Sequence, residues 1–243
     1  QGVSSAASDV YKRQVYGNTV VWKPASAVPL LALRLAEALT TAGLPPGVLN
    51  LLIGNSAAGD ALVNHADIDA ITFTGSTGVG RRIAGAAAAR GVPVQAEMGG
   101  KNAAVVLDDA DFDLAVEQVM LGAFRSTGQK CTATSRLVLT AGIADRFLEA
   151  LSAKADALVV GDPSVDATQM GPVVSRAAQT DIIGGIDTAR AQGASVLAGG
   201  GGYDDGPLTD GHFVAPTIVE LTTPADIWTE ELFGPVLAVR RAD

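Results

Sequence analysis

Cys131 is the only cysteine of this 243-residue chain, and it lies in the segment Ser126-Thr-Gly-Gln-Lys-Cys-Thr132. A lone cysteine is most often an inert buried thiol, but the neighbours here are small or polar, and Lys130 would favour the nucleophilic thiolate. A nucleophile also needs a base. Both histidines, His65 and His212, lie in segments that we expect to be loops and are assigned structural or surface positions. No Cys–His pair is therefore indicated.

Glu97 is a candidate base for this thiol. It ends an apolar stretch and is followed by Met-Gly-Gly-Lys101, so we expect it to be poorly solvated. Burial disfavours a charged carboxylate and would raise its pKa towards the range of a general base. A strand-end glutamate paired with Lys101 is the alternative, and the residues alone leave both open.

The glycine-rich segment Gly75-Ser-Thr-Gly-Val-Gly80 lies between a predicted strand and a predicted helix. Free N–H groups and the positive end of the helix dipole meet at such a turn, which suits a phosphate. The spacing differs from that of the usual dinucleotide fingerprint. A glycine-rich turn without a ligand is equally consistent with the residues.

Other charged residues have simple structural interpretations. Glu231 belongs to an acidic pair before a Gly-Pro turn, which is typical of a solvated loop, and Lys23 is a lysine at a strand end. There is no Cys/His cluster with zinc-ligand spacing, so we expect no metal.

Apolar runs alternate with helical patterns from residue 17 onward. This alternation predicts βαβ units with right-handed crossovers, an α/β fold with a doubly wound parallel sheet. The predicted strands are 19–22, 48–53, 70–74, 93–97, 103–107, 136–140 and 236–239, and the predicted helices are 29–41, 56–65, 78–90, 111–126 and 143–159. Glycines 199–202 are expected to link two extended segments.

Composition restricts the class of protein. Hydrophobic residues make up 48% of the chain, which indicates a globular fold, and the formal net charge of -9 argues against sequence-independent binding of nucleic acid. No apolar run is long enough to span a membrane, and no secretory leader is apparent. We therefore expect a cytoplasmic protein. Residues 1–16 differ in character from the rest and suggest a cloning or sequencing junction, with a natural flexible arm as the alternative. A domain boundary is expected at 97–101.

Five motifs in order resemble the aldehyde dehydrogenase superfamily: WKP (22–24), FTGSTxxG (73–80), EMGGKN (97–102), GQKCTA (128–133) and EELFGPV (230–236). The interval from Glu97 to Cys131 also matches the family's spacing. The resemblance covers 17–243 and implies a partial Rossmann-like NAD(P)-binding domain at 17–98 and a partial α/β catalytic domain at 99–243.

The resemblance implies a two-stage oxidation of an aldehyde. Cys131 attacks the aldehyde carbon to give a thiohemiacetal, whose hydride passes to the nicotinamide, and its backbone N–H is one oxyanion donor. Glu97 then activates the water that hydrolyses the thioester. Members that pass the acyl group to coenzyme A generally lack this glutamate, so its presence favours a free carboxylate product.

The same resemblance assigns the cofactor contacts. Lys23 would bind the adenosine ribose, and Gly75 and Ser76 the pyrophosphate. Glu231 would hold the nicotinamide ribose, with Phe233 beside the nicotinamide. NAD-preferring members commonly carry a glutamate three residues after the lysine, whereas this chain has Ser26, so we expect NADP to be accepted along with NAD.

For the substrate, KPAS (23–26), EMGGKN and the segment 107–111 look most like the semialdehyde branch, especially 2,5-dioxopentanoate (α-ketoglutaric semialdehyde) dehydrogenases, with succinate semialdehyde dehydrogenases as the alternative. Both substrates are anions, and Arg125 is the basic contact that we select. A solvent-facing arginine at a helix end is the competing interpretation.

The family's chain is about twice as long as this one. The resemblance implies that the first part of the cofactor domain, with the Asn that completes the oxyanion hole, is missing, together with the strand through which the parent homodimer or homotetramer assembles. The chain is therefore expected to be a fragment of a working dehydrogenase. An inactive remnant, or a protein with residual esterase activity from Cys131, are the alternatives.

Overall fold

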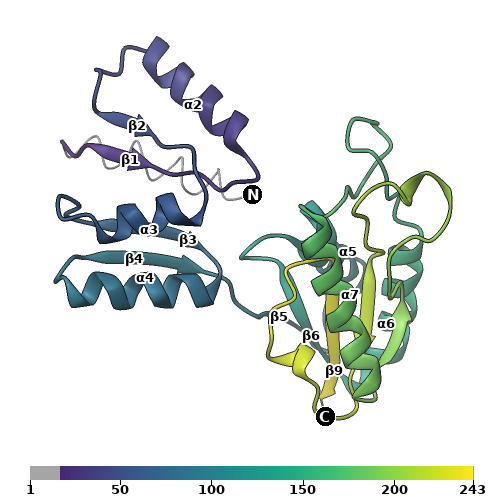
Figure 1. The fold of residues 1–243 in the computed structure, drawn as a ribbon. Coiled ribbons are helices and arrows are strands. Elements are labelled where there is room, and N and C mark those ends of the chain that lie inside the picture. The colour runs from purple at the N-terminus through teal and green to yellow at the C-terminus, as the bar shows by residue number, and fades with distance from the viewer. Residues whose placement is uncertain (1–16, 243) are drawn as a thin grey trace. The chain divides into compact units, whose positions relative to one another are not determined.

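A computed structural model describes residues 17–242, which form parts of two compact units, Gln1–Gly99 and Gly100–Asp243 (Figure 1). These are called the N-terminal and C-terminal units below. The expectation about residues 1–16 falls outside the described residues. No helix in the described part is long and apolar enough to cross a membrane.

Strands and helices alternate through the N-terminal unit. The strands are β1 (Val20–Trp22), β2 (Leu49–Leu51), β3 (Ile71–Gly75) and β4 (Val94–Met98), and the helices are α2 (Pro29–Thr41), α3 (Ser56–Asn64) and α4 (Thr77–Ala89). All of these elements were predicted within a few residues. β1 pairs with β2 and β3 with β4, both in parallel.

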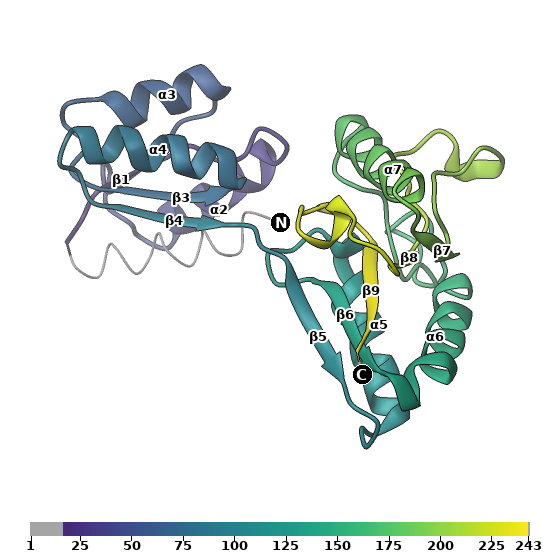
Figure 2. The ribbon, with the colours of Figure 1, turned by 90° about the horizontal axis from the view of Figure 1, so that it is seen from below.

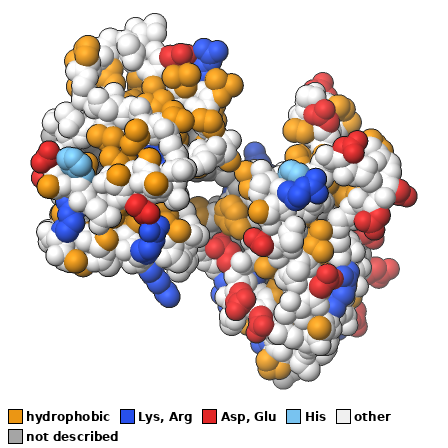
Figure 3. Space-filling model, in the orientation of Figure 1, with side chains coloured by type: hydrophobic (Ala, Val, Ile, Leu, Met, Phe, Trp, Pro, Cys, Tyr) orange, Lys and Arg blue, Asp and Glu red, His pale blue; other side chains and the backbone are white. Residues whose placement is uncertain are grey.

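The predicted parallel pairing is present in this unit, but the two parallel pairs form separate two-stranded sheets. A two-stranded sheet offers a helix little surface. Accordingly α2 buries only Ala32 completely, and Leu30, Leu31 and Leu33 remain exposed. Apolar side chains at the surface of this unit are visible in Figure 3.

Polar contacts join α3 to α4. Arg82 pairs with Asp60 at 2.8 Å. Arg90, which caps α4, donates to the carbonyl of His65 at 2.5 Å and also to that of Val63. His65 thus lies at the end of α3 in a structural role, as the sequence indicated.

The C-terminal unit is built on one five-stranded sheet. Its strands are β5 (Asn102–Val106), β6 (Thr134–Thr140), β7 (Ser195–Ala198), β8 (Thr217–Glu220) and β9 (Val236–Ala242), and its α-helices are α5 (Phe112–Phe124), α6 (Ala141–Asp156) and α7 (Arg176–Ala191). The strand order is β5-β6-β9-β8-β7, with β7 antiparallel to β8 and all other pairs parallel. The chain is therefore α/β, as expected.

Helices cover both faces of this sheet (Figures 1 and 2). Along β9, Leu237 and Val239 belong to the core that includes α5 and α6, whereas Val236 and Ala238 belong to the core that includes α7. Successive strand residues point to opposite faces, so one apolar run fills two cores. Asp111, the first residue of the predicted helix 111–126, caps α5 by accepting from the N–H of Leu114 at 3.2 Å.

Candidate functional site

A left-handed turn lies between α5 and Cys131. Ser126 and Thr127 have φ of 55° and 59°, and Gly128 follows with φ of 62°. They fall within a short 3-10 segment, η1 (Arg125–Gly128). L-residues rarely adopt this conformation, and each such residue costs about 1–3 kcal/mol, which persists only where the surroundings enforce it. Strain of this kind is concentrated at functional sites.

Buried contacts hold this turn in place. Thr127 is buried and donates through Oγ1 to the carbonyl of Gly171 at 3.3 Å. Gln129 is buried and accepts through Oε1 from the N–H of Val174 at 3.0 Å. A Cβ on Gly128 would overlap the carbonyl of Gly234, so the backbones of two of the sequence motifs approach each other here.

Cys131 follows the left-handed turn as a free, exposed thiol. It occupies the second position of a β-turn, because the N–H of Ala133 donates to the carbonyl of Lys130 at 3.0 Å. Within the described residues, no hydrogen bond from the Cys131 N–H is found. The thiol and a free peptide donor are therefore presented together.

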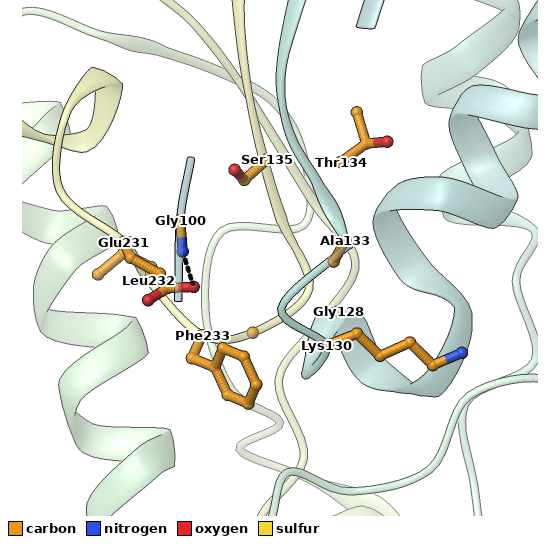
Figure 4. Close-up of a pocket in the computed structure, with 10 residues that line it drawn as sticks. Gly100, Gly128, Lys130, Ala133, Thr134, Ser135, Glu231, Leu232 and Phe233 are labelled. Carbon is orange, nitrogen blue, oxygen red and sulfur yellow. Dashed lines mark hydrogen bonds between the residues drawn. The ribbon is translucent and has the colours of Figure 1, made fainter. Parts of the chain in front are cut away.

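Glu231 and Phe233 lie in the same unit, in the loop before β9. Oε1 of Glu231 accepts from the N–H of Gly100 at 3.2 Å, and the Phe233 side chain is 40% exposed (Figure 4). They line a cavity of only about 10 Å³ together with Lys130, whose side chain extends away from them. A cavity of this size holds at most about one water, so it is no substrate pocket.

Lys101 has a shifted pKa beside this loop. The pKa of Lys101 is lowered to about 8: burial is the largest cause, the positive charge of Arg136 adds to it, and the Glu231 carboxylate partly offsets both. Arg136 donates to the carbonyl of Lys101 at 2.5 Å and stacks on Trp228, its guanidinium carbon lying 5.4 Å from the ring centroid. The two cations are thus held close together.

Glu97 lies in β4, at the end of the N-terminal unit. Burial alternates along this strand, and Glu97 is on the exposed side, where it accepts from Nε2 of Gln95 at 3.2 Å. The expectation of a poorly solvated carboxylate is wrong, because the pleat directs this position outward. Lys101, its alternative partner, belongs to the C-terminal unit, as does Cys131.

A cavity of about 760 Å³ in the N-terminal unit brings Lys23 and Ser26 together. The Lys23 ammonium donates to the carbonyl of Pro24 at 2.8 Å, and its aliphatic stem passes Gly59 of α3, where a Cβ would lie 3.5 Å from it. Ser26 is exposed. The volume is in the range of small-ligand pockets.

The glycine-rich turn places Ser76 at the N-cap of α4. Its hydroxyl does not cap the helix, and no acidic residue occupies the first turn. Gly78 faces open space, whereas a Cβ on Gly80 would collide with Met98 and one on Gly75 with Phe73. Gly75 and Gly80 thus permit close packing of the turn and of α4. The N-terminus of α4, together with the Ser76 hydroxyl, could accommodate a phosphate.

Arg125 caps the C-terminus of α5 through its backbone N–H, which donates to the carbonyl of Leu121, and its side chain is exposed. His212 lies inside the C-terminal unit, where its Nδ1 is buried without a hydrogen-bond partner among the described residues. Residues 17–242 contain no group of three His, Cys, Asp or Glu side chains that could hold a metal.

Three residues that lie near Cys131 were not identified from the sequence. Thr127 and Gln129 look like ordinary loop residues, and Asn102 looks like the polar start of a strand. Asn102 donates through Nδ2 to the carbonyl of Cys131 at 2.7 Å. No sequence pattern signals that a side chain 29 residues away contacts the backbone of Cys131.

Comparison with known proteins identifies the family. The family profile described as "Aldehyde dehydrogenase family" matches residues 3–243. The chain belongs to the aldehyde dehydrogenase family. The match begins within 1–16, the segment that we expected to lie outside the family's pattern.

Among curated aldehyde dehydrogenases, the chain is 44% identical to an α-ketoglutaric semialdehyde dehydrogenase of Bacillus subtilis (strain 168), over 94% of this chain and 47% of that protein. It is 43% identical to a betaine aldehyde dehydrogenase of Rhizobium etli (strain CIAT 652), over 93% and 46%. The chain thus spans about half the length of the curated relatives that it matches.

The fold also matches that of solved aldehyde dehydrogenases. PnpE from Pseudomonas sp. WBC-3 superimposes with a TM-score of 0.90 at 43% identity, over 93% of this chain and 47% of that one. A crystal structure of PnpE in complex with nicotinamide adenine dinucleotide matches this chain with the same TM-score, identity and coverage.

Proposed function

We propose that this chain carries part of the active site of an NAD(P)-dependent aldehyde dehydrogenase, with Cys131 as the nucleophile. The local structure at Cys131 carries the proposal. The thiol is exposed and lies in a β-turn that directly follows the strained left-handed turn, and its own N–H has no hydrogen-bond partner among the described residues. A merely structural cysteine is buried and needs no such arrangement.

In the proposed reaction, the Cys131 sulfur bonds to the aldehyde carbon and the carbonyl oxygen becomes an oxyanion. The free N–H of Cys131 stabilises that oxyanion, a contribution worth about two to three orders of magnitude per donor. A bound NAD(P)⁺ would supply the hydride acceptor that oxidation of the thiohemiacetal to the thioester requires. Glu97 then takes a proton from the water that releases the carboxylate, and its exposed side chain leaves it open to that water.

The N-terminal unit would hold the cofactor. Lys23 and Ser26 line a cavity large enough for part of a dinucleotide, and Ser76 with Gly75 forms the open N-terminus of α4 for the pyrophosphate. Glu231 and Phe233 would contact the nicotinamide end from the C-terminal unit. Ser26 carries no charge that would repel a 2′-phosphate, so we propose that NADP is used as well as NAD.

The proposed substrate is an anionic semialdehyde, such as 2,5-dioxopentanoate. The semialdehyde relative supports this class, whereas the betaine aldehyde relatives act on a cation and match almost as well. The exposed Arg125 guanidinium, close in sequence to the thiol, favours the anion. Succinate semialdehyde, which is also anionic, is the alternative substrate.

Cofactor reduction tests this proposal. The chain is incubated with NAD⁺ or NADP⁺ and with 2,5-dioxopentanoate, succinate semialdehyde or betaine aldehyde, and the nicotinamide absorbance is followed. We expect kcat/KM for the anionic aldehydes to exceed that for betaine aldehyde by about tenfold or more. A preference for betaine aldehyde would overturn the substrate class. Failure of all three aldehydes would overturn the activity for this chain and favour the inactive remnant.

A further inference from the structure

We propose that Asn102 is a positioning residue for the peptide group of Cys131, a role that rests on the proposed function. Its Nδ2 donates to two backbone carbonyls, that of Cys131 at 2.7 Å and that of Ala133 at 3.0 Å. One side chain thus bridges the carbonyl of the nucleophile itself and that of the residue two positions later. It holds the turn in which the thiol and the oxyanion donor are presented.

The two partners fix the orientation of the Asn102 amide. An amide oxygen cannot donate a hydrogen bond, so only the NH₂ group can face two carbonyl oxygens. Each of its hydrogens meets one carbonyl. Both hydrogen bonds lie within the ordinary length range for N–H···O contacts.

The backbone of Asn102 is held in the five-stranded sheet. Asn102 is the first residue of β5 and lies opposite Thr134 of β6, with a register shift directly after it. Its carbonyl accepts from Oγ of Ser135 at 3.4 Å. The bridge therefore connects the turn at Cys131 to the sheet rather than to another loop.

The bridge stabilises the turn that directs the Cys131 N–H outward. The carbonyl of Lys130 accepts from Ala133 inside the turn. Because a trans peptide directs its C=O and N–H to opposite sides, the Cys131 N–H must point out of the turn. Asn102 holds both the Cys131 carbonyl and the Ala133 residue that closes the turn. Thr127 and Gln129 clamp only the chain before it.

Two reagents separate positioning of the oxyanion donor from exposure of the thiol. Iodoacetamide alkylates the thiolate by direct displacement and forms no oxyanion. p-Nitrophenyl acetate acylates it: the sulfur bonds to the carbonyl carbon through an oxyanion, and p-nitrophenolate leaves. Because the chain has one cysteine, thiol alkylation reports on Cys131, and acylation of Cys131 is the part of p-nitrophenolate release that a Cys131→Ala variant lacks.

The variants are Asn102→Ala and Asn102→Asp, neither of which can donate to the two carbonyls. Asn50→Ala is the matched control, because Nδ2 of Asn50 also donates to two backbone carbonyls, those of Gly47 at 2.9 Å and Val20 at 3.4 Å, in the N-terminal unit. We expect acylation to fall about tenfold or more in the Asn102 variants, with alkylation changed less than about threefold. The control should leave both rates unchanged.

An unchanged ratio of acylation to alkylation in Asn102→Ala would overturn this inference, whether both rates stay the same or fall together. If the wild-type chain alkylates but does not acylate, the proposed function fails instead. Hydrogen exchange of the amides of residues 129–133 then decides the inference alone. Faster exchange in both Asn102 variants, but not in the control, supports it, and unchanged exchange refutes it.

Discussion

The N–H of Gly100 donates to a carboxylate oxygen of Glu231 at 3.2 Å, although 131 residues separate the two. This contact joins the start of the C-terminal unit to the loop before β9. It connects the EMGGKN and EELFGPV motifs. The sequence shows the order of these motifs along the chain but not that they are in contact. The same carboxylate acts on Lys101, one residue beyond Gly100.

Replacing Glu231 by Gln should lower the pKa of Lys101 further below its value of about 8. The amide oxygen of glutamine can still accept from Gly100, but the negative charge that raises the lysine pKa is gone. NMR titration of isotopically methylated lysines measures this shift, with Lys101→Arg to assign the signal. Glu230→Gln removes the same charge one residue away and should have a smaller effect; equal shifts in both variants would contradict the account.

The same group makes folding stability depend on pH. The pKa of Lys101 is about 8 in the folded chain, against an ordinary lysine pKa of 10.5, so the folded chain binds fewer protons than the unfolded chain between these values. The contribution of Lys101 to the free energy of unfolding therefore rises with pH across this window. Lys101→Met should flatten that rise in melting temperature measurements, whereas replacement of the exposed Lys154 should not. A slope unchanged by Lys101→Met would refute it.

Gly128→Ala should destabilise the C-terminal unit by about 3 kcal/mol or more. The substitution combines a left-handed backbone with a Cβ that overlaps the carbonyl of Gly234. Gly184→Ala, inside α7 with nothing near the added Cβ, should instead stabilise by about 1 kcal/mol. Urea unfolding measures both; a tolerated Gly128→Ala would mean that the turn before Cys131 is not held as described.

Ser26→Glu should weaken binding of NADP⁺ about tenfold or more and spare NAD⁺. A carboxylate at this position of the cavity would repel a 2′-phosphate and accept from ribose hydroxyls. Calorimetric titration of both cofactors gives the two dissociation constants. Ser195→Glu adds the same charge at the exposed first residue of β7 and serves as the control. Equal losses for NAD⁺ and NADP⁺ would place Ser26 away from the 2′ position.

Arg125→Ala should raise KM for an anionic semialdehyde about tenfold and leave KM for a neutral aldehyde unchanged, because only the anion loses an ionic contact. Steady-state kinetics with the two aldehydes separate these outcomes. Arg176→Ala removes an equally exposed arginine at the start of α7. If KM for the anion is unchanged, Arg125 is simply a solvent-facing arginine at a helix end.

The local patterns predicted most elements, because strand–helix alternation and caps such as Asp111 are encoded within a few residues. α7 was missed: its segment, RAAQTDIIGGIDTARA, contains a Gly-Gly pair and no net hydrophobicity. Its buried face, Ile182, Ile186 and Ala189, is set by the sheet beneath it. An extended segment before Gly199 was expected and corresponds to β7, but β8 was missed, because β7 pairs with an antiparallel partner 19 residues further along the chain.

The identities of the candidate site residues came from motif order, but their surroundings did not. Glu97 was expected to be poorly solvated, and the pleat of β4 turns it outward. The left-handed turn at Ser126 and Thr127 contradicts the preferences of these residue types, so no local signal predicts it. Tertiary contacts from Gly171, Val174 and Gly234 impose it.

Trapping of the acyl intermediate tests the central claim, that Cys131 carries the reaction, most directly. The chain is mixed with an aldehyde and oxidised cofactor, quenched in acid, digested and analysed by mass spectrometry. The account predicts a hydroxylamine-sensitive acyl adduct on the peptide that contains Cys131, dependent on the cofactor and absent from Cys131→Ala. Reduction of the cofactor at an undiminished rate by Cys131→Ala, or an adduct on another side chain, would contradict it.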